Sequence, residues 1–493
     1  MITVLLNRPD FEYDIHSLIK AFFPTENVYV ADHPKAKLQE AVSHHMDVFF
    51  ERKQLHFMFY EVDPEERPKL CGEDACEVDY DDRRDTKNRL KHTLYHMLSA
   101  YTGKTLPWGS LTGIRPTKIA MKMLEEGHSD QDILSYMRET YDASREKSVL
   151  SIRIAKRELA LLHRLDYENG YSLYIGIPFC PTTCLYCSFP SYSLAMWRER
   201  VDEYLDALER EIDFTAVTCA HRRLNTIYIG GGTPTTLSAG QLDRLMRKIK
   251  CSFDLSFLLE FTVEAGRPDS ITAEKLEVLK RHGVSRISIN PQTMKQATLD
   301  LIGRRHTVKQ TVESFLLARK AGFDNINMDL IAGLPGETLS DMEDTMREIR
   351  TLMPDNLTVH SLAIKRGSRL QMERERYQDL HIENTEGHIA LTARVAEEMG
   401  MTPYYLYRQK NMVGNFENVG YARPDKAGIY NVLIMEEKQT IMALGAGAVT
   451  KFVCDQPAGT VRVENVKDLA GYLARTDEMI ERKRKKMEEL SWH

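Results

Sequence analysis

Six short β-rich runs alternate with amphipathic helical stretches between residues 172 and 364, and this alternation restricts the possible folds more than any other feature. The expected strands are 172–179, 225–231, 258–265, 285–292, 326–335 and 356–364. After the first strand, apolar side chains recur at helical spacing at Trp197, Val201, Leu205, Leu208 and Ile212. Further helices are expected at 238–250, 272–282, 308–321 and 338–351. Strand–helix alternation builds a parallel sheet with right-handed crossovers. Six units are too few for a closed eightfold barrel, so the sequence predicts an α/β fold with a partial (β/α)6 barrel.

The segments on either side of the barrel have different patterns. Residues 1–165 predict an N-terminal α+β extension, with strands in 1–7, 27–32 and 46–63 and a hairpin around Arg52–Lys53. An acidic, turn-rich stretch (61–82) and several helices follow, and Pro116 suits the first turn of one of them. Residues 366–493 predict a mostly helical C-terminal region that covers the substrate and ends in a charged, solvated helix. The predicted domains are therefore 1–165, 166–365 (the barrel core) and 366–493.

Composition limits the class of protein. A net charge of −6 on 493 residues argues against nucleic acid as a main partner. No apolar run approaches the roughly 20 residues that cross a bilayer, so we expect no membrane span. The first residues lack a basic segment and a cleavage site, which predicts no signal peptide and a cytoplasmic protein. Cysteines that cluster in such a reducing compartment are more often metal ligands or catalysts than disulfides.

Three of the eight cysteines lie within eight residues, directly after the first expected barrel strand. Cys180, Cys184 and Cys187 have the spacing C-x3-C-x2-C. Three thiolates cannot close a structural zinc site, which needs four protein ligands. They suit a [4Fe–4S] cluster in which one iron stays free for a ligand that the protein does not supply. Zinc and an incidental grouping are the alternatives that spacing alone leaves open.

This motif resembles the signature of the radical S-adenosylmethionine (radical SAM) superfamily, which includes an aromatic residue before the last cysteine, here Tyr186. The resemblance implies that Cys180, Cys184 and Cys187 bind a [4Fe–4S] cluster. It also implies that the free iron binds the amino and carboxylate groups of S-adenosylmethionine. In that superfamily, an electron from the cluster cleaves the cofactor to a 5′-deoxyadenosyl radical, so no other catalytic residue is required.

Glycine-rich and polar elements follow the later expected strands. The stretch IGGGTPTTL (229–237) follows the second strand, and its glycines allow the backbone to approach a ligand closely. Glu264 ends the third strand, and Gln292, Arg304 and Asp329 follow in the next two units. Taken singly, a glycine-rich turn or a paired carboxylate is common without a ligand. Their position is informative, because active sites of such barrels lie at the carboxyl ends of the strands.

In combination these elements resemble oxygen-independent coproporphyrinogen III oxidase and its heme chaperone-like relatives. The stretches YIGIPFCPTTCLYC, GGGTPT and DLIAGLP occur in the family's order between about 172 and 365, and the flanks resemble coproporphyrinogen dehydrogenase-like proteins. The resemblance implies that Tyr174, Gly231 and Glu264 contact the S-adenosylmethionine on the cluster. It places a second S-adenosylmethionine near Tyr186, Gly232, Thr233, Gln292, Arg304, Asp329 and Ala363, with Val449 as a hydrophobic contact. The implied partners are a tetrapyrrole, coproporphyrinogen III or heme, and an electron donor such as flavodoxin or ferredoxin.

One position departs from the porphyrinogen-oxidising pattern. Those enzymes carry a further cysteine two residues after the third, where this chain has Phe189, as the chaperone-like relatives have an aromatic residue. The resemblance therefore leaves three hypotheses. The first is anaerobic oxidative decarboxylation of coproporphyrinogen III to protoporphyrinogen IX, in which the radical abstracts a propionate hydrogen, carbon dioxide leaves and an acceptor takes the remaining electron. The second is heme binding without turnover, and the third is radical chemistry on another tetrapyrrole.

Candidate contacts to a tetrapyrrole follow from its chemistry. Its carboxylates would pair with cations, for which the candidates are Lys365, Arg366, Arg408 and Arg423. Each of them is as readily an ordinary surface charge. A heme would also need an axial ligand, for which His360, His381 and His388 are candidates.

Overall fold

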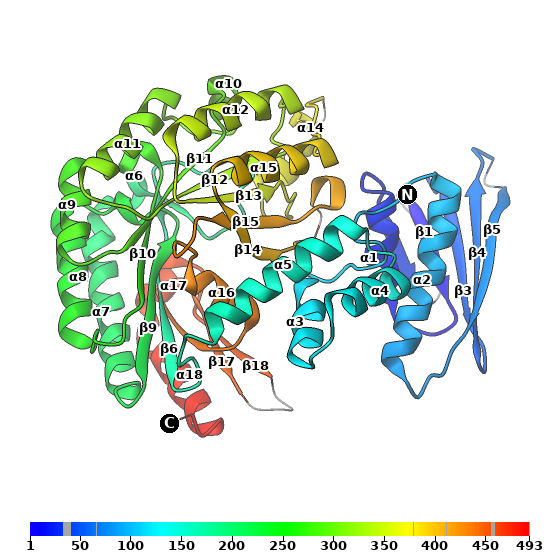
Figure 1. The fold of residues 1–493 in the computed structure, drawn as a ribbon, viewed down its shortest axis with the longest axis horizontal. Helices are drawn as coiled ribbons and strands as arrows, with labels where there is room; N and C mark the ends of the chain where they lie inside the picture. Colours follow the sequence, from blue (N-terminus) through cyan, green and yellow to red (C-terminus); the bar gives the residue numbers. More distant parts are fainter. Residues whose placement is uncertain (33–40, 66, 378, 411, 455–458, 493) are drawn as a thin grey trace. The chain divides into compact units, whose positions relative to one another are not determined.

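The computed structural model describes residues 1–32, 41–65, 67–377, 379–410, 412–454 and 459–492 (Figure 1). The chain forms two compact units. The N-terminal unit comprises Met1–Ala155 with Arg408–Phe416, and the barrel unit comprises Lys156–Tyr407 with Glu417–His493. The division into three domains predicted from the sequence stays a prediction.

The N-terminal unit contains a five-stranded sheet with the order β2-β1-β3-β4-β5. Inward-facing apolar residues alternate with polar ones along its strands, and α1 and α2 pack on the resulting face. The predicted hairpin around Arg52–Lys53 is the turn between β3 and β4, whereas the acidic stretch expected to be rich in turns contains a long strand, β5. The elements are β1 (Ile2–Leu6), α1 (Glu12–Phe22), β2 (Val28–Ala31), β3 (His44–Phe50), β4 (Gln54–Val62), β5 (Pro68–Glu77), α2 (Arg83–Thr102), α3 (Thr117–Glu125), α4 (Asp130–Tyr141) and α5 (Arg145–Leu162).

The barrel unit contains the predicted partial (β/α)6 barrel. Six strands pair in parallel in the order β6-β9-β10-β11-β12-β13, and the connecting helices lie outside them (Figure 1). The strands are β6 (Gly170–Ile177), β9 (Arg223–Gly231), β10 (Glu260–Gly266), β11 (Arg286–Gln292), β12 (Ile326–Ala332) and β13 (Asn356–Ser361). The helices are α7 (Val201–Thr218), α8 (Ala239–Ser252), α9 (Ala273–Arg281), α10 (Gln296–Leu301), α11 (Val308–Lys320) and α12 (Leu339–Leu352). Between β6 and α7 lie β7 (Phe179–Cys180), β8 (Tyr192–Ser193) and α6 (Leu194–Trp197).

The C-terminal region adds helices and also extends both edges of the barrel sheet. Strand β16 pairs in parallel with β6 and continues into β17 and β18, while β15 pairs antiparallel with β13 and β14 pairs with β15. The strands are β14 (Thr402–Tyr407), β15 (Asn418–Ala422), β16 (Thr440–Leu444), β17 (Val449–Val453) and β18 (Thr460–Glu464). The helices are α13 (Arg369–Met372), α14 (Arg374–Tyr377), α15 (Glu386–Glu398), α16 (Ile429–Glu436), α17 (Leu469–Ala474) and α18 (Thr476–Glu489). Among the described helices, none is long and apolar enough to span a bilayer.

The charged terminal helix α18 is not solvated on all sides, in contrast to the expectation. Lys483 is fully buried and forms an ion pair with Glu211 of α7, which is also fully buried. Glu211 also accepts hydrogen bonds from Tyr472, Asn465 and the backbone amide of Gly445. The hydrogen bond from the Gly445 amide connects Glu211 to the turn after β16, and this turn lies next to the carboxyl end of β6. The last helix therefore supports the barrel edge that precedes the cysteine loop.

Candidate active site

The cysteine loop leaves the carboxyl end of β6 and is attached to the segment after α10. Thr182 donates a hydrogen bond to the carbonyl of Gly303 at 2.8 Å, and the amide of Leu185 donates to Ile302 at 2.9 Å. The amide of Cys187 donates to the carbonyl of Cys184 at 3.2 Å, which closes a turn between these two cysteines. Hydrogen bonds to the segment after α10 thus fix the loop.

The three thiols suit a cluster better than a single ion. A zinc ion bound to three thiolates would hold their sulfur atoms roughly 3.8 Å apart. Among the described residues, the sulfur atoms of Cys180, Cys184 and Cys187 do not form a group in which all lie within 4.8 Å of one another. A wider spacing is what a four-iron cube needs, and thiolates are its usual ligands. The donor set therefore fits a [4Fe–4S] cluster.

Two arginines place positive charge beside the loop. Arg267 is buried, and its Nη1 donates to Thr182 Oγ1 at 2.8 Å and lies 3.9 Å from Cys184 Sγ. Arg304 donates to the carbonyl of Asn290, and its buried Nε has no hydrogen-bond partner among the described residues. Cations near thiolates stabilise their negative charge. Both side chains thus suit an anionic cluster.

Burial opposes ionisation of Cys180 and Cys187 while no iron is bound. It raises the pKa of Cys180 to about 11, although the nearby Thr233 hydroxyl partly counteracts this, and it raises the pKa of Cys187. Iron binds the thiolate form, so cluster assembly must release protons. We therefore expect assembly to be favoured at higher pH.

Gly232 allows the backbone after β9 to approach the cysteine loop. A Cβ atom at this position would lie 2.6 Å from the carbonyl oxygen of Phe179 and 3.0 Å from Cys180 Sγ. The next residue, Thr233, donates its amide to Phe179 and places its hydroxyl 3.6 Å from Cys180 Sγ. The glycine-rich stretch and the first cysteine thus form one continuous surface.

The barrel interior is lined by polar side chains at every second strand position. Thr226 donates to Ser172 at 2.7 Å, Asn327 donates to Ser288 at 2.7 Å, and Thr358 donates to Asn327 at 3.0 Å. These bonds join side chains of neighbouring strands, so the polar layer continues around the inside of the sheet. An apolar core needs no such layer, and a polar interior of this kind can bind a polar ligand.

Glu264 lies in this layer, at the end of β10. Tyr228 donates its hydroxyl to Glu264 Oε1 at 2.5 Å, and its ring stacks on Tyr430 with centroids 4.5 Å apart. Burial raises the pKa of Glu264 to about 7, although the Tyr228 hydrogen bond opposes the shift. A Cβ at Gly230 would lie 3.3 Å from the Glu264 carboxyl carbon, so glycine keeps the space in front of it open. Glu264 is thus a buried hydrogen-bond acceptor next to the space that Gly230 leaves open.

Asp329 lies two strands away and has a different environment. Burial pushes the pKa of Asp329 up, but His360, Asn327 and Arg286 outweigh this effect and hold the pKa below its usual value. Asn327 donates to Asp329 Oδ1 at 2.7 Å, and His360 Nε2 lies 3.9 Å from Oδ2. Asp329 therefore remains an anion in the buried layer.

The other predicted site residues lie near the barrel mouth or at its edge. Tyr186 lies beside Arg304, and Tyr174 stacks on Tyr228 with centroids 6.2 Å apart. Gln292 is buried with a φ of 70°, a left-handed conformation that costs a non-glycine residue energy and is often found at functional sites. Ala363 lies two residues after β13, and Val449 is the first residue of β17. Their side chains offer only van der Waals contacts.

Several site residues were not predicted from the sequence. They are Arg267, Tyr228, Tyr430 and His360, the last considered only as a heme ligand. Polar residues at alternate positions of the buried strands were the available signal for Tyr228 and His360, since buried parallel strands are ordinarily apolar throughout. No local pattern predicts Tyr430, which reaches the interior from α16, far along the chain.

The candidate cations for substrate carboxylates lie in three different places. Lys365 and Arg366 follow β13 at its carboxyl end, and Lys365 Nζ lies 5.8 Å from the centroid of the exposed Phe189 ring. Arg423 follows the antiparallel β15, so it lies beside Asp355 at the opposite end of the barrel. Arg408 is buried in the N-terminal unit, where it donates to Leu111 and Asn415. Only the first two can face a ligand at the cysteine end.

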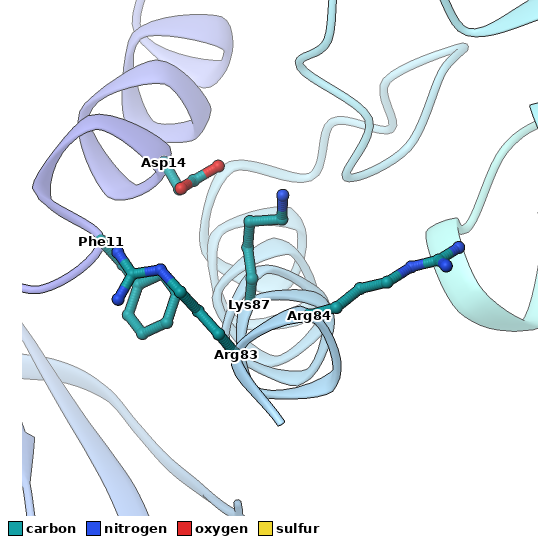
Figure 2. A pocket seen from close by; sticks show the side chains of 5 residues that line it. All are labelled: Phe11, Asp14, Arg83, Arg84 and Lys87. Carbon is teal, nitrogen blue, oxygen red and sulfur yellow. The ribbon is translucent and has the colours of Figure 1, made fainter. Parts of the chain in front are cut away.

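The N-terminal unit has a separate pocket, shown in Figure 2. Arg83, Arg84 and Lys87 line it from the first turns of α2, while Phe11 and Asp14 contribute from the start of α1. The guanidinium of Arg83 lies over the Phe11 ring, 4.6 Å from its centroid. The pocket is therefore lined mainly by cationic side chains.

Comparison with known proteins agrees with this geometry. Residues 174–349 match the Radical SAM superfamily. The oxygen-independent coproporphyrinogen-III oxidase-like protein HemZ of Bacillus subtilis is 41% identical over 411 residues, which cover 83% of this chain and 82% of HemZ. The chain belongs to the HemZ family of radical SAM proteins. Membership in this superfamily implies a [4Fe–4S] cluster and S-adenosylmethionine as cofactors.

Two other groups of relatives align with only part of the HemZ-family chain. The heme chaperone HemW of Bacillus subtilis is 46% identical over 39% of this chain and 51% of its own length. The oxygen-independent coproporphyrinogen III oxidase of Escherichia coli is 33% identical over 40% of this chain and 42% of its own. The structure of the Escherichia coli coproporphyrinogen III oxidase HemN has a TM-score of 0.51 and 24% identity over 65% of this chain and 73% of its own, which shows a shared fold.

Proposed function

We propose that this HemZ-family protein is an enzyme that oxidatively decarboxylates coproporphyrinogen III to protoporphyrinogen IX without oxygen. The observation that carries the proposal is the polar barrel interior, with the carboxylates of Glu264 and Asp329 at the end where the cysteine loop lies. When bound, the cluster and S-adenosylmethionine would supply the radical that removes a hydrogen atom from a propionate. Each of two propionates then loses carbon dioxide and passes one electron to an acceptor, which leaves a vinyl group.

The chain's own residues would bind and orient the reactants. Glu264, Tyr174 and Gly231 would hold the S-adenosylmethionine on the cluster, with Glu264 accepting hydrogen bonds from the ribose. Asp329 and Arg304, together with Tyr186, Gly232, Thr233, Gln292, Ala363 and Val449, would surround a second S-adenosylmethionine. The stacked rings of Tyr174, Tyr228 and Tyr430 would keep water out of the barrel interior next to the residues that hold S-adenosylmethionine.

Among the candidate heme ligands, His360 fits heme binding least well, because it has neighbours at both of its ring nitrogens. Asp329 Oδ2 lies 3.9 Å from His360 Nε2, and the Tyr407 hydroxyl lies 3.4 Å from His360 Nδ1. His381 pairs with Glu383 at 3.0 Å, and His388 contacts Thr385 at 2.9 Å as part of a helix cap. An axial histidine needs only one free nitrogen for iron and commonly shares the other with a carboxylate or carbonyl, so only His360 is disfavoured as an axial ligand. A propionate-bearing porphyrinogen needs only cations, and Lys365 and Arg366 offer them at the correct end of the barrel.

Heme binding without turnover is the second candidate, and one residue favours it. Phe189 occupies the position where the oxidising enzymes carry a further cysteine, and its ring is 67% exposed near the cysteine loop. An exposed ring of this size could pack against a planar macrocycle.

Anaerobic turnover would distinguish the two candidates. We expect reconstituted protein, given S-adenosylmethionine, a reductant and coproporphyrinogen III, to form a product lighter by two molecules of carbon dioxide and four hydrogen atoms, detected by mass spectrometry after oxidation. Radical chemistry on a different tetrapyrrole would consume S-adenosylmethionine only when that tetrapyrrole is supplied. Tight, stoichiometric heme binding with untouched coproporphyrinogen would contradict the enzyme proposal.

Glu264→Gln should weaken S-adenosylmethionine binding while sparing the cluster. Losing a charged hydrogen-bond partner in a shielded site costs about 1.5–3 kcal/mol, or roughly ten- to a hundredfold in affinity. The pKa of Glu264 is about 7, so its carboxylate form, and with it the binding, should increase as pH rises through that value. Measuring 5′-deoxyadenosine formation from pH 6 to 8 tests both points. Equal formation and an equal pH profile in the variant would exclude the assigned contact.

A further inference from the structure

A cluster of metal-ligating side chains lies in the N-terminal unit, outside the radical site. His92 and His96 are four residues apart on α2, so both imidazoles project from the same face of the helix. Asp142 caps the C-terminus of α4 with φ 55° and ψ 23°, a left-handed conformation that Asp tolerates better than most residues. This turn places the Asp142 carboxylate against the two imidazoles.

The distances among the three groups are those of a metal site. His92 Nε2 lies 3.3 Å from His96 Nε2 and 3.5 Å from Asp142 Oδ2, and His96 Nε2 lies 3.0 Å from Asp142 Oδ1. Ligand atoms bound at about 2.0–2.2 Å from one ion, in tetrahedral or octahedral geometry, lie roughly 3.0–3.5 Å apart. Of the residues that the structure describes, no other histidine, cysteine or carboxylate set converges this closely.

Hydrogen bonding does not account fully for this arrangement. Asp142 Oδ2 is buried and accepts no hydrogen bond within the described part of the chain. The two imidazole Nε2 atoms face each other, and between two neutral rings only one of these nitrogens can donate while the other accepts. A cation between the three groups would use all of these lone pairs at once, which removes the cost of an unsatisfied buried carboxylate oxygen.

We propose that His92, His96 and Asp142 bind a divalent transition-metal ion of the Zn²⁺ class. Imidazole selects such ions, whereas Ca²⁺ and Mg²⁺ prefer sites built from oxygen ligands. Three protein ligands leave at least one coordination position for water or another ligand. The ion would join α2 to the turn between α4 and α5, and it would thereby stabilise the folded N-terminal unit.

Zinc uptake by the untagged full-length protein with its cluster assembled tests this site. We expect one zinc per chain by equilibrium dialysis and metal analysis, undiminished by excess Mg²⁺ or Ca²⁺. His96→Ala and Asp142→Asn should each lower the affinity at least tenfold, the smaller of the losses seen when metal sites are perturbed. His128→Ala is the matched control, because His128 is an exposed histidine of the same unit that lies 3.7 Å from one carboxylate.

Thermal unfolding gives a second readout that does not depend on activity. Asn also tolerates the left-handed conformation, so Asp142→Asn should unfold near the wild-type temperature without zinc. Zinc should raise the unfolding temperature of the wild type and of His128→Ala, and not that of Asp142→Asn. The proposal is overturned if the wild type takes up no zinc or if all variants bind zinc equally. It is also overturned if zinc uptake is lost when Cys184 is replaced but not when His96 or Asp142 is replaced.

Discussion

Anaerobically reconstituted protein in which Cys180, Cys184 or Cys187 is replaced by alanine is expected to lose nearly all of its cluster. The wild type should carry about four irons and four sulfides per chain, because three thiolates and one cofactor ligand complete a [4Fe–4S] site. With two thiolates remaining, the loop lacks the ligands to retain the cube. Iron and sulfide analysis, together with the visible absorption of the cluster, measures the loss.

The other five cysteines provide the control. Replacing Cys71, Cys76, Cys219, Cys251 or Cys454 by serine should leave the iron content and the absorption unchanged, since these residues lie outside the loop. If one of these replacements abolished the cluster, a site with four cysteine ligands would be the better interpretation.

Lys483→Met is expected to destabilise the barrel unit by about 3–5 kcal/mol, because it leaves the Glu211 carboxylate buried without its counter-charge. Lys483 Nζ is fully buried and also donates to the carbonyl of Ala443 at 2.7 Å, so the variant loses a second hydrogen bond. Calorimetric unfolding under anaerobic conditions would show the loss as a large fall in the transition temperature of this unit.

A double variant separates the charge effect from the packing effect. Glu211→Gln combined with Lys483→Met removes both charges while Gln still accepts the hydrogen bonds of Tyr472 and Gly445, so much of the stability should return. Lys486→Met removes an exposed charge from the same helix and should change stability by less than about 0.5 kcal/mol. A single Lys483→Met variant as stable as Lys486→Met would show that the buried pair contributes little.

The barrel could be predicted from the sequence because each of its elements carries a local signal. Its strands are short and rich in β-branched residues, and helices with one apolar face separate them. The later strands of the same sheet gave weaker signals. Strand β16 pairs with β6 although about 270 residues separate them, and local periodicity carries no information about such a pairing.

Parts of the candidate site could be predicted where the spacing of residues along the chain determines their chemistry. Parts that depend on how distant strands and helices are arranged could not be predicted. The cysteine spacing identified the loop, and the expected strand ends identified Glu264 and Asp329, although Asp329 lies in the middle of β12 and not at its end. Arg423 was a reasonable carboxylate partner by residue type alone, but β15 runs antiparallel to β13 and carries it to the wrong end. Likewise, the charge run of α18 has the pattern of a solvated helix, and only tertiary packing reveals that Lys483 is buried.

The ion pair between Glu211 and Lys483 has a consequence for biosynthesis. Lys483 lies in the last helix, so a nascent chain contains the complete barrel sequence well before the counter-charge of Glu211 and the partner strand of β6 have been synthesised. Domains generally fold as units during translation, but the barrel unit lacks the counter-charge of Glu211 until α18 has left the ribosome. Iron delivery to the cysteine loop is therefore expected to follow the synthesis of α18, which completes the support of the barrel edge beside the loop.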